Sequence, residues 1–409
     1  MSTAIPDLPI LAADDSMLSR KFGREVTNYF SGSPLNRVSF LRTDHAFLKA
    51  AFAYPKTSFL LMDNYSPLAK DTQNLAYVSG DDIALLTGTD PFGASDEEQI
   101  RNFNSEITQP IILFLGLDEK KPDFAYRDYK GHPYFAIDVT PKGTIAEKAK
   151  EVINAVKARD GVSFIPGARL LTLNAPEAAI YAQARALLDW NARNPFCGGC
   201  GQRTLSINAG TKRVCPPTDM AGISDGGEPH KRDDCPTRHG ISNLCFPRTD
   251  PTVIMAIVSS DGTKLLLGRS KRYPPGWYST LAGFLEPGES IEEAVRRETW
   301  EESGVRVGRV VIHSSQPWPY PANLMIGAIG QALPDGENIH LGNDPELEDA
   351  KWYTFDEVRD AMKDSLVPFG EAVSGEKKER KLLIPPQTAI ANRLMAAVVE
   401  GYLAAAPKM

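Results

Sequence analysis

The chain has 409 residues, of which 42% are hydrophobic and 24% are charged, and its formal net charge is -7. This length predicts two or three domains, each able to bury a core of its own. The acidic balance excludes a general electrostatic surface for nucleic acid, although a local site could hold one polyanion through a metal ion. No apolar stretch is long enough to span a bilayer and no signal sequence is visible, so we expect a soluble intracellular protein without a membrane partner.

The N-terminal part of the chain is predicted to form a mixed α/β domain. Short apolar runs bounded by turn residues are expected to be strands at residues 58–63, 83–88, 111–118 and 134–139. No internal repeat or catalytic pattern is visible among them. In residues 175–191 the apolar side chains recur on one helical face, so a helix is expected to lead into the next region.

All five cysteines lie between Cys197 and Cys245, which indicates a metal site and not an extracellular disulfide scaffold. Cys197 and Cys200 form a CxxC pair, and Cys215 and Cys235 can supply the other two thiolates of a tetrahedral structural Zn²⁺. Residues 216–234 are rich in Pro, Gly and charge, so we expect a loop inserted within the second half of the site.

The fourth zinc ligand has competitors in the sequence. Cys245, His230 and His239 could each replace Cys235, and we take Cys245 as the spare thiol. The other interpretation of the cluster is a redox-active or merely buried pair of thiols without a metal ion.

The C-terminal part of the chain begins with strong local signals. The sequence TVIMAIVSSDGTKLLLGRS predicts two strands joined by a hairpin turn at residues 261–262. Further on, Ser290 and Glu293 form an S-x-x-E capping box, which predicts a helix over residues 291–303 that Gly304 ends.

This helix ends in the sequence RRETWEESG, in which Glu298, Glu301 and Glu302 are expected to share the face opposite the buried stripe. Like charges at this spacing, near the negative end of the helix dipole, destabilise a helix. Mg²⁺ or Mn²⁺ would offset the repulsion, because these ions bind through a few carboxylates. The alternative is an acidic face open to solvent, since Glu is a good helix former. Arg297 is expected to pair with Glu293 or Glu301.

The spacing around these glutamates resembles the Nudix box, Gx5Ex7REUxEExGU. Its positions are occupied by Gly283, Glu289, Arg297, Glu298, Glu301, Glu302, Gly304 and Val305. Thr299 stands where the family has an aliphatic residue on the packed side of the helix, so we expect a small packing change and intact chemistry.

A second element resembles the NADH pyrophosphatase subgroup of this family. The sequence SQPWPYPANLM is similar to the subgroup element SQPWPFPxS, with Tyr320 in place of Phe and Asn323 at the serine position. The zinc ribbon and the preceding sequence ALLDWNARNPFCGGCG are further features of the subgroup. Independently of the resemblance, the prolines predict a rigid extended segment whose aromatic rings can stack on a nicotinamide or adenine base. The alternative is that Trp318 and Tyr320 are core residues.

The resemblance implies a chain of class α+β or α/β in three parts. These are a mixed α/β N-terminal domain (residues 1–165), a helix with the zinc ribbon and its inserted loop (166–246), and a Nudix domain whose mixed β-sheet lies between helices (247–409). Members of the family hydrolyse a nucleoside diphosphate linked to another moiety. The implied reaction here is hydrolysis of the pyrophosphate bond of NAD(H) to nicotinamide mononucleotide and AMP, by a homodimer.

The resemblance also implies roles for single residues. Glu298 and Glu302 would bind Mg²⁺ or Mn²⁺ together with the main-chain carbonyl of Ala282, and Glu301 would hold a second metal ion or its water. We favour Glu302 as the general base and Arg297 as the residue that organises the glutamates.

Other implied positions lie outside the helix. Glu346 is linked to metal and substrate, with Glu348 and Asp349 as near neighbours that could take its place. The dinucleotide site would contain Gln316, Pro317, Trp318, Pro319, Tyr320, Pro321, Ala322, Asn323, Phe284 and the main chain of Ala391.

Two other functions are compatible with the sequence. The same site could act on ADP-ribose, diadenosine polyphosphates or the NAD cap of RNA. Alternatively, the zinc ribbon could be a binding module beside an inactive Nudix domain, but the intact glutamates and the few basic residues near the ribbon argue against it. The C-terminal residues Pro407, Lys408 and Met409 resemble a divergent peroxisomal address, so we expect a cytoplasmic or peroxisomal location and contact with a peroxisomal import receptor.

Overall fold

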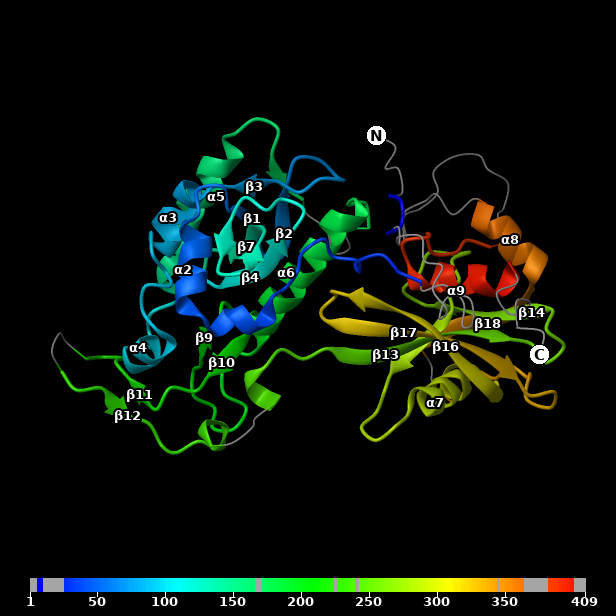
Figure 1. The fold of residues 1–409 in the computed structure, drawn as a ribbon. Helices are drawn as coiled ribbons and strands as arrows, with labels where there is room; N and C mark the ends of the chain where they lie inside the picture. Colours follow the sequence, from blue (N-terminus) through cyan, green and yellow to red (C-terminus); the bar gives the residue numbers. More distant parts are fainter. Residues whose placement is uncertain are drawn as a thin grey trace.

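A computed structural model describes residues 6–9, 26–165, 171–223, 227–239, 243–343, 346–363 and 382–400. It contains two mixed β-sheets, each with helices on both faces, and a small cysteine-containing region between them in the chain (Figure 1). No helix in these ranges has the length and apolar character needed to cross a membrane. The C-terminal tripeptide 407–409 lies outside the described residues.

The first sheet has the strand order β4-β7-β1-β2-β8, with β3 also paired to β1. Strands β1 and β7 are parallel and the other neighbours are antiparallel. A small hairpin formed by β5 (Ala125–Tyr126) and β6 (Tyr129–Lys130) lies between β4 and β7 in the chain. The strands of the sheet are β1 (Ser58–Asp63), β2 (Ser66–Ala69), β3 (Tyr77–Val78), β4 (Ile112–Asp118), β7 (His132–Asp138) and β8 (Ser163–Phe164).

Helices cover both faces of this sheet, as the burial along β1 shows. Phe59 and Leu61 pack toward one core with α2 (His45–Ala53), α3 (Gly80–Thr87) and α5 (Ala146–Lys157), whereas Leu60 and Met62 pack toward α6 (Ala175–Arg193). Alternation with a period of two is expected for a strand buried on both faces. The shorter helices are η1 (Ser39–Thr43), α4 (Asp96–Arg101) and η2 (Gly143–Ile145).

One strand prediction in this domain was wrong. Residues 83–88 lie in or directly after helix α3, because Ser79 and Asp82 form a capping box that starts a helix at Gly80. Ile83 and Leu86 are three residues apart and both are buried. This spacing of apolar residues is compatible with a short helix as well as with a strand. The predicted strands at 58–63, 111–118 and 134–139 are confirmed as β1, β4 and β7, and the helix at 175–191 is confirmed as α6.

The cysteine-containing region has more order than the predicted loop. Strands β9 (Leu205–Ile207) and β10 (Lys212–Val214) form one hairpin, and the insertion forms a second from β11 (Thr218–Asp219) and β12 (His230–Lys231). A buried ion pair between Arg232 and Asp219 holds the second hairpin, and the Arg232 guanidinium lies 4.9 Å from the Phe103 ring of the first domain. Two turns of 3-10 helix follow, η3 (Pro236–Arg238) and η4 (Asn243–Cys245).

The second sheet has the order β16-β17-β13-β14-β18, with β15 also paired to β13. Helix α7 (Ile291–Ser303) packs on one face, and α8 (Phe355–Lys363) and α9 (Ile390–Val399) pack on the other. The predicted hairpin at 261–262 is confirmed, with Gly262 at a φ of 73°. The strands are β13 (Asp250–Val258), β14 (Lys264–Ser270), β15 (Leu281–Phe284), β16 (Val307–Trp318), β17 (Asn323–Ala332) and β18 (Leu347–Thr354).

The two sheets have the same topology. In each, a parallel central pair is flanked by an antiparallel strand on either side, and an extra short strand paired with the central strand is the element before a capped helix, α3 or α7. This repeat between the two domains was not predicted from the sequence. Helix α3 ends in Ile-Ala-Leu-Leu-Thr, without the carboxylates of α7, so the repeat duplicates the scaffold without the acidic site.

Candidate active site

Helix α7 lies so close to β15 that Gly283 has no room for a side chain. A Cβ atom built on Gly283 would lie 1.9 Å from Cδ of Glu298 and 2.1 Å from its Oε2. Strand β15 is also fixed from its other side, because Gly283 is opposite Val253 of β13. The glycine therefore lets the Glu298 carboxylate rest directly against the backbone of β15, next to Ala282 in the chain.

Gly283→Ala is expected to lower kcat/KM by at least about 100-fold, because displacing a reacting group by an ångström has an effect of this size. Steady-state kinetics on the purified full chain would measure it, with circular dichroism to check the fold. Gly80→Ala is the matched control, since the nearest atom to its Cβ would lie 3.8 Å away in ordinary contact. Unchanged kinetics in Gly283→Ala would contradict this account of the glycine.

Arg297 connects the loop after β15 to the glutamates of α7. Its Nε and Nη2 donate to the two carboxylate oxygens of Glu289 at 2.6 and 2.8 Å. Its Nη1 donates to Glu298 and Glu301, both at 2.9 Å, and Nη2 also donates to the carbonyl of Phe284 at 2.9 Å. Charge-assisted bonds of this kind fix carboxylates firmly, and this geometry agrees with the organising role expected for Arg297.

The partners of Arg297 differ in part from those predicted. The pairing with Glu301 is confirmed, but Glu293 instead accepts a bond from the Ser290 amide at 2.8 Å as part of the helix cap. Glu289, which had no predicted role beyond its position in the box, is the bidentate partner. The bond from Arg297 holds the pKa of Glu289 down to about 2, so its carboxylate stays charged throughout the physiological range.

The three glutamates of α7 differ in burial. Glu302 is 5% exposed, whereas the side chains of Glu298 and Glu301 are 13% and 35% exposed. The alternative of an acidic face open to solvent is therefore wrong for Glu302. Thr299 is fully buried on the packed side as predicted, and its hydroxyl donates to the Val295 carbonyl at 2.7 Å.

The excess negative charge of the site would favour a divalent cation, although the carboxylates of the described residues do not already form a closely gathered metal cluster. Glu289, Glu298 and Glu301 bring three negative charges to the single positive charge of Arg297. Burial raises the pKa of Glu298; Arg297 opposes this, and the carboxylates of Glu301 and Glu346 raise it further. Excess negative charge in a partly desolvated place is unfavourable unless a cation shares it, and carboxylate oxygens are the ligands that Mg²⁺ and Mn²⁺ prefer. Glu346 is itself exposed, at the edge of this group.

The predicted dinucleotide segment emerges at the same end of the sheet as the glutamates. Across the strands, Phe284 is opposite Thr252, Thr252 is opposite Met325, and Met325 is opposite Gln316. Three strand spacings, about 14 Å, therefore separate the end of β15 from Gln316 of β16. Phe284 is 57% exposed, and its main-chain carbonyl accepts a hydrogen bond from Arg297.

Gln316 is engaged inside the protein. It is 1% exposed, and its Nε2 donates to the carbonyls of Tyr29 at 3.0 Å and Thr388 at 2.9 Å. Its Oε1 accepts a bond from the Ile390 amide at 2.9 Å, at the start of α9. These three bonds tie β16 to the first domain and to α9, so the amide orders the segment.

The aromatic residues of the segment face the first domain. The rings of Trp318 and Tyr320 lie 5.9 and 6.0 Å from the ring of Phe30, and 5.4 Å from each other. Both are half-buried against the core that contains α6. The alternative that they are packing residues is therefore correct for the buried part of each side chain. Among the other predicted residues of the dinucleotide site, Pro317 and Pro321 are half-buried. Pro319, Ala322 and Ala391 of α9 are buried.

Asn323, at the serine position of the element, starts β17. Its Nδ2 donates to Oγ1 of Thr252 at 3.0 Å, which fixes the end of the segment to β13. Its buried Oδ1 has no hydrogen-bond partner among the described residues, so it can accept one from a ligand.

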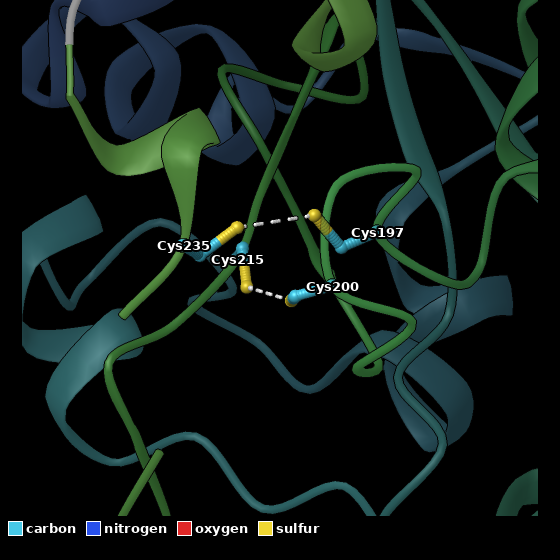
Figure 2. Close-up of side chains that lie close together, drawn as sticks. All are labelled: Cys197, Cys200, Cys215 and Cys235. Atoms are coloured by element: carbon cyan, nitrogen blue, oxygen red, sulfur yellow. Dashed lines mark hydrogen bonds between the residues drawn. The ribbon is translucent and has the colours of Figure 1, made fainter. Parts of the chain in front are cut away.

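The four predicted zinc ligands meet at one point (Figure 2). The sulfurs of Cys197, Cys200, Cys215 and Cys235 lie within 4.8 Å of one another, with 3.5 Å between Cys197 and Cys235 and between Cys200 and Cys215. Four sulfurs around a tetrahedral Zn²⁺ lie about 3.8 Å apart, so this set fits the ion. Burial raises the pKa of Cys215 to about 12, which a bound cation would reverse.

The competing ligands lie elsewhere. The Cys245 sulfur lies 4.0 Å from the Thr237 carbonyl, and Nε2 of His239 is 2.6 Å from a carboxylate oxygen of Asp234. His230 is exposed on β12. The geometry therefore favours Cys235 as the fourth position of the site.

Comparison with known proteins agrees with this arrangement. Family models match residues 56–190 (NADH pyrophosphatase-like rudimentary NUDIX domain), 192–220 (NADH pyrophosphatase zinc ribbon domain) and 248–372 (NUDIX domain). The NAD-capped RNA hydrolase of Schizosaccharomyces pombe is 36% identical over 377 residues, which cover 91% of this chain and 92% of that protein. The chain belongs to the NADH pyrophosphatase subgroup of the Nudix hydrolases.

Two further relatives of this Nudix hydrolase show the same extent of similarity. The NAD-capped RNA hydrolase NUDT12 of Homo sapiens is 34% identical, over 91% of this chain and 73% of that protein. The NAD-capped RNA hydrolase NPY1 of Saccharomyces cerevisiae is 33% identical, over 91% and 96%. Membership of the family makes the chain a pyrophosphohydrolase.

The family matches explain two features of the fold. The rudimentary Nudix domain is the first sheet, whose topology repeats that of the second sheet. The zinc ribbon match ends at residue 220, before the insertion is complete, so it does not include Cys235. That cysteine is brought back to the site only by the β11–β12 hairpin.

Several contacts of the site had no signal in the sequence. Those of Asn28 and Tyr29 with β16 join residues almost 290 positions apart, and no local pattern marks them. The roles of Gly283 and Glu289 could have been suspected, because both occupy fixed positions of the Nudix box.

Proposed function

We propose that this Nudix hydrolase cleaves the pyrophosphate bond of NAD(H) to give nicotinamide mononucleotide and AMP. The observation that supports the proposal is the register of the second sheet: the end of β15, against which Glu298 packs, and the aromatic segment lie at the same end, with the exposed Phe284 on that edge. A site for a dinucleotide needs both features, because the phosphates bind at a metal ion and the bases stack on aromatic rings.

The names of relatives support this substrate class. Three proteins that are similar over 91% of this chain are named NAD-capped RNA hydrolases. The mitochondrial NAD(P)H pyrophosphatase NUDT13 of Mus musculus is 34% identical over 65% of this chain. All of these names refer to a nicotinamide dinucleotide or to its attachment to RNA.

In the proposed reaction the chain's own residues place water and substrate. Glu298, Glu301 and Glu302 would hold the divalent cation, with Ala282 and Glu346 at its edge and Arg297 fixing the carboxylate positions. The cation would neutralise phosphate charge and acidify a water molecule. Glu302, the most buried of the three, takes a proton from the attacking water; the water oxygen bonds to one phosphorus, and the bond from that phosphorus to the bridging oxygen breaks.

A second candidate is removal of the NAD cap from RNA, favoured by the names of the relatives. It breaks the same bond in a larger substrate, so the glutamate chemistry is unchanged. The net charge of -7 gives the protein no general attraction for the RNA chain, and for this reason we propose NAD(H) ahead of capped RNA. The homodimer and the peroxisomal address remain predictions.

The test is hydrolysis of NADH, NAD⁺, ADP-ribose and an NAD-capped oligonucleotide by the purified full chain, with Mg²⁺ or Mn²⁺ and again with EDTA. We expect metal-dependent release of AMP and reduced nicotinamide mononucleotide, fastest from NADH, resolved by chromatography. Faster turnover of ADP-ribose would contradict selection of nicotinamide, and absence of turnover with every substrate would identify an inactive Nudix domain.

A further inference from the structure

The turn between β16 and β17 is held by a residue of α6, the helix that covers one face of the first sheet. Arg185 lies on α6, and its guanidinium is 4.9 Å from the ring of Tyr65 and 4.8 Å from the ring of Tyr320. Its Nε donates to the carbonyl of Pro319 at 2.6 Å. The guanidinium therefore joins a residue of the first sheet domain, Tyr65, to the turn that carries Tyr320.

A second set of contacts holds the strand that leads to the turn. Nδ2 of Asn28 donates to Oγ of Ser314 at 3.0 Å and to the carbonyl of Ser315 at 2.9 Å. The ring of Phe30 meets Trp318 edge-on, with an interplanar angle of 78°. These contacts hold the last residues of β16, and both Phe30 and Arg185 contact the turn itself.

We propose that Arg185 is a positioning residue for the dinucleotide site. It fixes the turn at 318–320 at the distance from the carboxylates that the substrate requires, and so gives the rudimentary Nudix domain a part in substrate binding. The proposal rests on the proposed function, since it assumes that this turn contacts the dinucleotide. A planar guanidinium between two rings, with one N–H directed at a carbonyl, fixes both the tilt and the height of the turn.

The expected consequence of losing Arg185 is a defect in binding. If the turn is not held in advance, substrate binding must supply the ordering cost, and this weakens affinity without changing the bond-breaking step. Arg185→Ala is expected to raise KM for NADH about tenfold, with kcat changed by less than about twofold. Arg185→Lys is expected to recover part of the loss, because it keeps a cation near the rings and loses the planar stack.

A matched control is available on the same helix. Arg193 is also an arginine of α6, and it pairs with Asp189 one turn away. Arg193→Ala is expected to leave KM and kcat unchanged. An equal rise of KM in Arg193→Ala would overturn the proposal, because it would trace the defect to a general disturbance of α6.

Hydrogen exchange in the substrate-free full chain supplies a readout that does not need activity. The Tyr320 amide donates to the Trp318 carbonyl at 2.8 Å, so its exchange rate reports opening of the turn. In Arg185→Ala we expect this amide to exchange about tenfold faster, and in Arg193→Ala at the wild-type rate. Wild-type exchange together with wild-type KM in a folded Arg185→Ala would overturn the proposal.

The two readouts separate the outcomes. Faster exchange with an unchanged KM for NADH would show that Arg185 only stabilises the turn, which also overturns the proposal. If the wild-type enzyme does not hydrolyse NADH, the proposed function fails. The role of Arg185 is then tested with the substrate that is hydrolysed: a higher KM for that substrate together with faster exchange in Arg185→Ala supports the positioning role, and an unchanged KM overturns it. Should Arg185→Ala fail to fold, Arg185→Lys and Tyr65→Leu are measured instead, and wild-type values in both would overturn the proposal.

Discussion

Replacing Glu302 with Gln is expected to lower kcat for pyrophosphate hydrolysis by at least about 100-fold, because a positioned general base contributes an effect of this size. Glu302 is 5% exposed on α7, four residues after Glu298, so its carboxylate is shielded from bulk solvent on the helix that carries Glu298. Gln has nearly the same volume, and it removes the negative charge that would bind the cation and accept the proton. The effect should therefore appear in turnover and not in folding.

Steady-state kinetics with NADH, together with zinc content and thermal unfolding, would measure this change. Glu292→Gln is the matched control, because it removes a carboxylate from the first turn of the same helix, away from the Glu298 end. Wild-type kcat in Glu302→Gln would remove both the base and the ligand role from this residue. Lost activity accompanied by lost structure would assign Glu302 to packing.

Replacing Cys235 with Ser is expected to reduce bound zinc from about one ion per chain to nearly none and to unfold the cysteine-containing region, since a structural zinc site supplies much of the folding free energy of a small region. Cys235 is fully buried, and its sulfur is 3.5 Å from that of Cys197. It also anchors the end of the insertion, so its loss releases the β11–β12 hairpin. A lower melting temperature and faster proteolysis within 197–245 are expected.

Metal analysis of protein purified under reducing conditions would test this, with Cys245→Ser and His239→Ala as controls. Both controls should retain zinc, since neither side chain belongs to the group of four sulfurs. Zinc retained in Cys235→Ser but lost in either control would show that the competing residue is the fourth ligand.

Much of the acidic site could be predicted from the sequence because its determinants are local. Ser290 and Glu293 start α7, and Gly304 ends it in a left-handed conformation with a φ of 74°. Between them, the spacing of the glutamates follows from the helix period alone. The same local rules explain the one wrong strand, because the apolar run 83–88 is too short to distinguish a strand from a helix and the cap at Ser79 decided it.

The sequence by itself thus determined the capped acidic helix, the cysteine cluster and the family to which the chain belongs. Only the tertiary structure decided the burial of Glu302, the bidentate pairing of Glu289, the internal use of the Gln316 amide and the repeated topology of the two sheets. The physical reason is range: periodicity and capping act within a few residues, whereas the contacts of Asn28 and Arg185 with the β16–β17 segment depend on how two separately buried sheets pack together.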